Sequence, residues 1–193
     1  DLHEKFSEIG VNFESCEMSR TGTNPIPDLK TCFDLYELFR KIRPVIVLNF
    51  TVKPVIYGSI AARFAGVPKT ASNITGIGSI LTAPTSGLKN RILSRVLFFL
   101  YRVSLRSNHS VFFQNPDDLE LFASNKLVAV SRAVLLNGSG VDLNRFKPSE
   151  QTKSEHGRFL FIGRLLLDKG IHEFIKAAEI LKAEFPEAEF SIL

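Results

Sequence analysis

The sequence predicts an α/β fold in which parallel strands alternate with helices. Short runs of β-branched and aromatic residues alternate with longer segments whose apolar residues recur at helical spacing, as in βαβ units. The composition is that of a globular chain, since 45% of the 193 residues are hydrophobic and 23% are charged. The longest apolar runs are too short to cross a bilayer, so no transmembrane helix is expected.

Seven segments have the length and composition of strands. They are residues 11–15, 45–50, 69–74, 110–114, 133–136, 158–162 and 189–193. Helical spacing predicts helices at residues 29–42, 55–64, 86–106, 115–122 and 171–185. The boundaries have chemical signals: Pro44 ends one helix, and Asn115 followed by Pro116 is typical of an N-cap and a first helical position.

A change in composition divides the chain into domains. Residues 143–157 lose the apolar period and collect Pro, Ser, Lys and Glu, which is typical of a linker. Residues 1–142 then form an amino-terminal domain, and residues 158–193 begin a second domain that is too short to build a core alone. The chain starts with Asp1 and ends on a predicted strand, so we expect a piece of a longer protein with both domains incomplete.

Several kinds of site are not expected. The two cysteines, Cys16 and Cys32, are too few for a disulfide scaffold and lack zinc-ligand spacing, and the four histidines fit no catalytic triad. We therefore expect reduced thiols, no metal and no cofactor. Nucleic acid is not an expected partner, because the chain has no Trp and its net positive charge is concentrated in one segment.

Residues 158–170, with the sequence RFLFIGRLLLDKG, join a predicted strand to a predicted helix. Ligands of open α/β sheets bind beyond the carboxyl ends of strands, and free N–H groups at a helix amino terminus attract phosphate. Arg164 and Lys169 in this loop suit a diphosphate, because one offers a planar fork to phosphate oxygens and the other a compact charge. An ordinary surface loop, in which Lys169 pairs with Asp168 or with its own helix, explains the local pattern equally well.

Three segments together resemble a known family. Residues 158–170 and the helix after them resemble the start of the donor domain in retaining glycosyltransferases of family 4, which have the GT-B fold. Residues 137–142 (NGSGVD) and 61–68 (AARFAGVP) resemble further elements of that family, so the resemblance extends from about Leu29 onward. Residues 73–78 (NITGIG) look like the branch that extends lipid-linked saccharides with N-acetylhexosamines.

The resemblance implies an enzyme that transfers a sugar, with retention, from a UDP-N-acetylhexosamine to a polyprenyl-diphosphate-linked saccharide, in cell-surface polysaccharide or glycan biosynthesis. Arg164 and Lys169 are expected to bind the donor diphosphate and to be catalytic, with Gly163 and Gly140 as further donor-binding positions. The family's paired glutamates and its glycine-rich loop fall outside these 193 residues, so we expect the chain alone to be inactive.

Thr75, Gly76 and Gly78 follow a predicted strand and are expected to line the acceptor side of the cleft, because glycine permits close approach of a ligand. An ordinary strand-to-helix turn is the other interpretation. Many relatives have a histidine at the end of this strand, and the chain departs from that pattern with Thr75-Gly76.

Five basic residues and no acidic residue lie between Ser86 and Arg106, in a predicted helix. Arg91, Arg95, Arg102 and Arg106 form one stripe, opposite the apolar side. Such a stripe suits an anionic membrane surface, which predicts a cytoplasmic protein peripheral to the inner face of the cell membrane. The other interpretation is an amphipathic helix whose apolar side packs on the core and whose arginines are solvated.

A second function, of a different class, is a non-catalytic nucleotide- or lipid-binding Rossmann-like module that the arginine stripe attaches to membranes. A dinucleotide-dependent oxidoreductase is disfavoured, because the sequence contains no G-x-G-x-x-G fingerprint followed by an acidic residue about 20 positions later.

Overall fold

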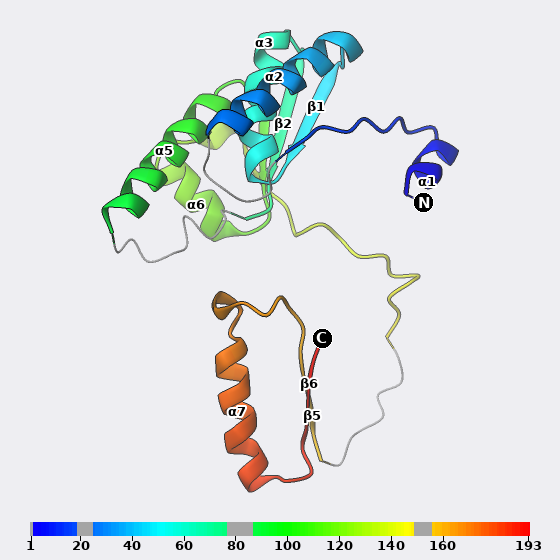
Figure 1. Ribbon diagram of the computed structural model, residues 1–193, viewed down its shortest axis with the longest axis vertical. Coiled ribbons are helices and arrows are strands. Elements are labelled where there is room, and N and C mark those ends of the chain that lie inside the picture. Colours follow the sequence, from blue (N-terminus) through cyan, green and yellow to red (C-terminus); the bar gives the residue numbers. More distant parts are fainter. Residues whose placement is uncertain (1, 19–24, 77–86, 149–155) are drawn as a thin grey trace. The chain divides into compact units, whose positions relative to one another are not determined.

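The chain forms two compact units, residues 1–140 and residues 141–193, each with its own sheet (Figure 1). The structure is a computed structural model that describes residues 2–18, 25–76, 87–148 and 156–193. The linker expected at 143–157 and the domain bounds on either side of it stay predictions, and residues 149–155 lie outside the described residues.

The first unit contains a four-stranded sheet with the order β1-β2-β3-β4, and every neighbouring pair is parallel. Its strands are β1 (Ile46–Phe50), β2 (Lys69–Ile74), β3 (Ser110–Phe113) and β4 (Ala133–Leu135). These bounds confirm the four strands predicted between residues 45 and 136. Because parallel strands need crossover connections, helical segments separate each strand from the next.

The helices of this unit are α1 (Leu2–Glu8), α2 (Pro25–Ile42), the π-helix η1 (Pro54–Gly58), α3 (Ser59–Ala65), α5 (Leu88–Leu105), α6 (Pro116–Ser124) and the 3₁₀ turn η2 (Val130–Arg132). The predicted N-cap is confirmed, since the Asp118 N–H donates to Asn115 Oδ1 at 2.7 Å. Helix α2 begins at Pro25, earlier than the predicted residue 29, because proline is well tolerated in a first helical turn.

The strand predicted at residues 11–15 is wrong. These residues pair with no strand in the part of the chain that the structure describes. The adjoining segment instead contacts α2, where Lys30 Nζ lies 3.1 Å from Glu17 Oε2 and Thr31 Oγ1 donates to the Glu17 carbonyl at 3.0 Å. Alternating apolar and polar residues form a strand only where a neighbouring strand supplies hydrogen bonds, and none of the described strands pairs with residues 11–15.

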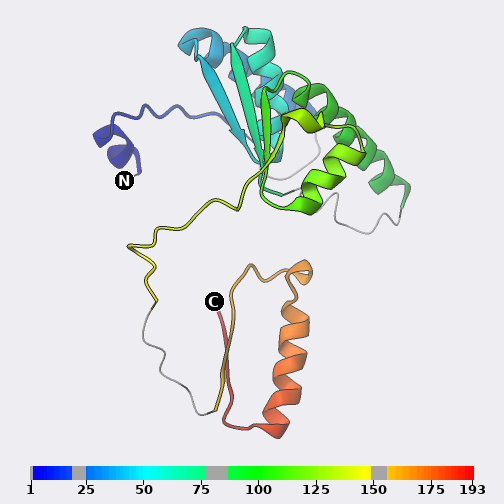
Figure 2. The same ribbon diagram turned by 180° about the vertical axis from the view of Figure 1, so that it is seen from behind.

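Helices α2, α3, α5 and α6 lie on one face of the sheet, in front of it in Figure 1 and behind it in Figure 2, whereas α1 lies away from the sheet. The core contains Phe113 from β3, Tyr101 from α5 and Phe122 from α6. The Phe122 ring lies 4.9 Å from the Tyr101 ring and 5.3 Å from the Phe113 ring, both edge-on. On the opposite face, Leu48 and Phe50 remain about half exposed.

A buried polar network joins the first two strands to the helices. Asn49 Nδ2 on β1 donates to Ser59 Oγ at 3.2 Å, and Asn108 Nδ2 donates to the same oxygen at 3.0 Å. Ser72 Oγ on β2 donates to Asn108 Oδ1 at 2.7 Å. A Cβ atom at Gly58 would collide with Asn49 Oδ1, so the network fits only when this position is glycine.

The second unit consists of β5 (Arg158–Phe161), the 3₁₀ turn η3 (Leu167–Lys169), α7 (Ile171–Glu184) and β6 (Glu189–Ile192), with β5 and β6 parallel. The strands and the helix predicted here are confirmed. Four aromatic rings hold the unit together: Phe159 stacks on Phe190 at 4.9 Å, and Phe174 of α7 lies 5.5 Å from Phe161 and 6.0 Å from Phe190.

Candidate functional site

The loop that leaves the carboxyl end of β5 carries both predicted catalytic cations. The Leu193 N–H donates to the Phe161 carbonyl at 2.9 Å, so the parallel neighbour supports β5 up to the start of the loop. A 3₁₀ turn then leads into α7, with the Lys169 N–H donating to the Leu166 carbonyl at 3.0 Å. Arg164 and Lys169 therefore belong to one loop at the edge of the sheet where ligands of open α/β folds bind.

Both cations are exposed to solvent. Neither Arg164 nor Lys169 forms an ion pair with any side chain that the structure describes. The side chain of Asp168, the partner considered from sequence, lies outside the described side chains. The positive charges of Arg164 and Lys169 are therefore not neutralised by an ion pair with any described acidic side chain.

The amino terminus of α7 adds to the positive character of this loop. Gly170 adopts a left-handed conformation with φ of 80°, and no side chain caps the helix. The first intrahelical bond runs from the Phe174 N–H to the Gly170 carbonyl at 3.0 Å, so the N–H groups of the first turn have no partner within the helix. A phosphate near these N–H groups is stabilised by hydrogen bonds and by the helix dipole.

The backbone favours glycine at one of the two predicted donor-site positions, Gly140, but not at the other, Gly163. Gly140 has φ of 79°, a conformation that favours glycine for backbone reasons. At Gly163 a Cβ atom would make only an ordinary contact, 3.5 Å from the Phe161 ring, so the fold itself does not require glycine there. The close approach of a ligand at Gly163 stays a prediction.

The predicted acceptor-side residues follow β2. Thr75 is exposed, Gly76 is half-buried with φ of 147°, and Gly78 lies outside the described residues. Near the end of the strand, Asn73 is buried, and its Oδ1 has no hydrogen-bond partner in the described part of the chain. The end of β2 therefore combines a glycine of positive φ with a buried amide oxygen that has no hydrogen-bond partner among the described residues.

Sequence analysis also missed a buried charged cluster just after β1. Lys53 Nζ lies 2.7 Å from Asp28 Oδ1, and the Tyr57 hydroxyl donates to Asp28 Oδ2 at 2.8 Å. Burial raises the pKa of the Tyr57 hydroxyl, and its hydrogen bond to Asp28 raises that pKa further. The residue that precedes this cluster, Thr51, has φ of 68°, which is unusual for threonine. Asp28 and Lys53 are 25 positions apart, so no local pattern predicts their contact.

The four predicted membrane-facing arginines lie on α5 or at its carboxyl end. Arg91, Arg95, Arg102 and Arg106 are all exposed. The Arg102 guanidinium also donates to the carbonyls of Asn125 at 2.9 Å and Lys126 at 3.4 Å, at the carboxyl end of α6. Arg102 therefore has a structural role that the charge pattern did not predict.

The apolar side of α5 does not pack entirely on the core, although the interpretation of a core-facing amphipathic helix expected it to. Leu97 and Tyr101 are buried in the core, but Ile92 is 53% exposed and Phe99 is 61% exposed. Apolar residues occupy more of the helix circumference than a single sheet face can cover, so part of this side stays in solvent.

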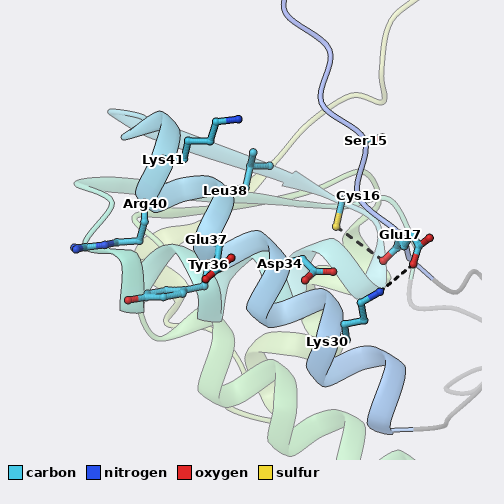
Figure 3. A pocket seen from close by; sticks show the side chains of 10 residues that line it. All are labelled: Ser15, Cys16, Glu17, Lys30, Asp34, Tyr36, Glu37, Leu38, Arg40 and Lys41. Atoms are coloured by element: carbon cyan, nitrogen blue, oxygen red, sulfur yellow. Dashed lines mark hydrogen bonds and ion pairs between the residues drawn. The ribbon is translucent and has the colours of Figure 1, made fainter.

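A groove of about 740 Å³ lies between the amino-terminal segment and α2 (Figure 3). Its charged lining includes Lys30, which pairs with Glu17 at 3.1 Å, and Lys41, which lies 4.0 Å from Glu14. None of the predicted site residues lines this groove.

The described part of the chain contains no cluster of metal-ligating side chains. No three His, Cys, Asp or Glu side chains there are arranged to hold a metal ion. Burial raises the pKa of the Cys32 thiol, which keeps its reactive thiolate scarce at neutral pH. Among the same residues, no helix has the length and apolar character needed to cross a bilayer.

The amino-terminal unit matches a known protein family. Residues 2–115, more than half of the chain, match the family described as "Glycosyl transferase 4-like". The chain belongs to the glycosyl transferase 4-like family. This confirms the resemblance that the motifs at residues 61–68, 137–142 and 158–170 predicted.

One relative of the chain is the N,N'-diacetylbacillosaminyl-diphospho-undecaprenol alpha-1,3-N-acetylgalactosaminyltransferase of Campylobacter jejuni subsp. jejuni serotype O:2. It is 25% identical over 191 residues, which cover 93% of this chain and 50% of the relative. The glycosyl transferase 4-like chain thus spans about half the length of this relative.

Among solved structures, the S. aureus MnaA-UDP co-structure is similar, with a TM-score of 0.55 and 14% identity over 99% of this chain and 51% of that chain. At this identity the similarity shows the fold alone. The predicted GT-B-type α/β fold is confirmed.

Proposed function

We propose that this chain contributes to a glycosyltransferase that moves an N-acetylhexosamine from a UDP-sugar to a polyprenyl-diphosphate-linked saccharide. Membership of the glycosyl transferase 4-like family supports glycosyl transfer. The name of the Campylobacter relative describes transfer of N-acetylgalactosamine to a diphospho-undecaprenol-linked sugar, which supports the donor and acceptor classes. The proposed location is cytoplasmic, peripheral to the inner face of the cell membrane, in cell-surface polysaccharide or glycan biosynthesis.

The observation that carries the proposal is the loop between β5 and α7. It presents Arg164 and Lys169, neither of them paired with a described acid, next to the uncapped amino terminus of α7. Two cations and a row of free N–H groups match the charge and the acceptor oxygens of a diphosphate. Gly163 is the proposed point of close approach between backbone and donor.

The proposed step breaks the bond between the anomeric carbon of the donor sugar and its diphosphate oxygen. A new bond forms to an acceptor hydroxyl oxygen on the same face of the sugar, so configuration is retained, and the hydroxyl proton passes to the departing diphosphate. Negative charge grows on the diphosphate as its bond breaks, and Arg164 and Lys169 stabilise that charge. The two side chains supply this positive charge without a metal. Thr75 and Gly76 are the proposed contacts on the acceptor side.

The test is UDP release by the full-length gene product, with a panel of UDP-sugars and a short polyprenyl-diphosphate saccharide. We expect acceptor-dependent release, and Arg164→Ala or Lys169→Ala is expected to lower turnover by about 100-fold, the scale of removing one charge that stabilises a transition state. Lys176→Ala is the matched control, because Lys176 is an exposed lysine of α7 outside the loop.

Wild-type turnover in both loop variants would remove Arg164 and Lys169 from the site. Absence of release with every donor and acceptor pair, together with UDP binding that Lys169→Ala weakens, would favour the non-catalytic nucleotide-binding module instead.

A further inference from the structure

The exposed side of α5 carries a continuous apolar stripe. Its members are Leu88, Ile92, Val96, Phe99 and Val103, which are 74%, 53%, 48%, 61% and 36% exposed. They recur every three or four positions, so they lie above one another on a single face of the helix. Exposed apolar residues that are scattered singly need no explanation, but a contiguous stripe on one helix marks an interaction surface.

This stripe lies opposite the part of α5 that enters the core. With about 100° per residue and Arg91 as origin, the five apolar residues fall at about 60° to 140° around the helix. The buried residues Leu97, Tyr101 and Leu105 fall at about 240° to 320°. The exposed stripe is therefore not the margin of the core, and nothing in the described part of the chain covers it.

The arginines border the same stripe. Arg91, Arg95, Arg102 and Arg106 fall at about 0° to 60° around the helix, beside the exposed apolar residues, which corrects the expectation that the arginine stripe lies opposite the apolar side. Arg102 is bound to the carboxyl end of α6, so Arg91, Arg95 and Arg106 are the cations of this face that have no partner among the described residues. Helix α5 contains no acidic residue.

We infer that this face of α5, made of Leu88, Ile92, Val96, Phe99, Val103, Arg91, Arg95 and Arg106, docks on the surface of an anionic lipid bilayer. The apolar stripe enters the boundary between headgroups and acyl chains, and the arginines at its edge contact lipid phosphates. An apolar stripe with cations along one side is the pattern of helices that lie in a membrane interface.

Charge favours a bilayer over a second copy of the chain. Two copies joined through this face would bring six arginines together, with no acidic residue from α5 to offset them. The surface of an anionic bilayer meets both needs, because its headgroups supply negative charge for the arginines and its acyl region supplies an apolar environment for the stripe.

The first experiment measures co-sedimentation of the 193-residue chain with vesicles of phosphatidylcholine alone and with added phosphatidylglycerol. We expect binding that requires the anionic lipid and weakens with salt. Arg91→Gln combined with Arg95→Gln should weaken partition about 30-fold, since each cation near an anionic surface contributes about 1 kcal/mol, or about fivefold. Arg40→Gln, an exposed arginine of α2, is the matched control and should change partition less than about twofold.

The second experiment locates the helix in the bilayer. The chain has no Trp, so Phe99→Trp introduces a single reporter on the apolar stripe, and Phe64→Trp on α3, where Phe64 is 74% exposed, is its control. With anionic vesicles, the emission of the Phe99→Trp variant should shift to the blue and be quenched by lipids brominated on their acyl chains. The emission of the Phe64→Trp variant should do neither.

Equal binding to neutral and anionic vesicles, or equal quenching of both reporters, would overturn the inference. A dimer in sedimentation equilibrium that Phe99→Ser dissociates, without vesicle binding by the parent chain, would overturn it in favour of a second copy. The assays contain no nucleotide sugar, so their outcome is independent of whether the proposed transfer reaction is observed.

Discussion

Lys53 Nζ lies 2.7 Å from Asp28 Oδ1, and this largely buried ion pair ties α2 to the segment that follows β1. The Tyr57 hydroxyl satisfies the second oxygen of the same carboxylate at 2.8 Å. The chain also contains an exposed counterpart, in which Lys30 pairs with Glu17 at 3.1 Å. The two pairs have similar geometry but opposite solvent exposure.

Breaking the buried pair should cost far more than breaking the exposed one. We expect Asp28→Ala to lower the free energy of unfolding by about 3 kcal/mol, because it leaves Lys53 buried without its partner. Glu17→Ala should change it by about 0.5 kcal/mol or less, as is usual for surface pairs. All three tyrosines lie in the first unit, so urea unfolding followed by tyrosine fluorescence reports on that unit alone. Equal losses in the two variants would show that burial does not strengthen the pair.

Gly58→Ala tests the contact between η1 and β1. Gly58 has helical backbone angles, where replacing glycine by alanine normally stabilises a helix by about 1 kcal/mol. Here the added Cβ would collide with Asn49 Oδ1 and disturb the buried network, so we expect a loss of about 2 kcal/mol. In the double variant with Asn49→Ala, the two effects should be non-additive by at least about 1 kcal/mol. Stabilisation by Gly58→Ala alone would show that Asn49 moves aside without cost.

Tyr101 should make the first unit sensitive to alkaline pH. Its ring is fully buried, its hydroxyl has no hydrogen-bond partner among the described residues, and burial raises its pKa. Above about pH 10 the unfolded chain releases this proton while the native state retains it, so stability falls as pH rises. Tyr101→Phe should leave stability at pH 7 equal or slightly higher and remove about 1.4 kcal/mol per pH unit of the alkaline loss. Parallel curves for the two proteins, in urea titrations followed by far-UV circular dichroism, would contradict this prediction.

Local patterns in the sequence predict the order and type of most helices and strands. Periodicity depends on which face of a strand or helix is buried, and that information is local, so six strands and the capped start of α6 were predictable. The loop with Arg164 and Lys169 was also predictable, since the strand, the cations and the helix start are consecutive in the chain.

Contacts between side chains that are far apart in the chain depend on how the elements pack, which no local pattern predicts. The 25 positions between Asp28 and Lys53 leave no local trace, and the network of Asn49, Ser72 and Asn108 depends on strand register. Strand formation at residues 11–15 likewise depends on a neighbour, and no strand in the described part of the chain supplies hydrogen bonds to them. On α5 the sequence shows which residues are apolar but not which of them are buried. The one sheet face covers only part of the helix, so Leu97 is buried while Phe99 stays in solvent.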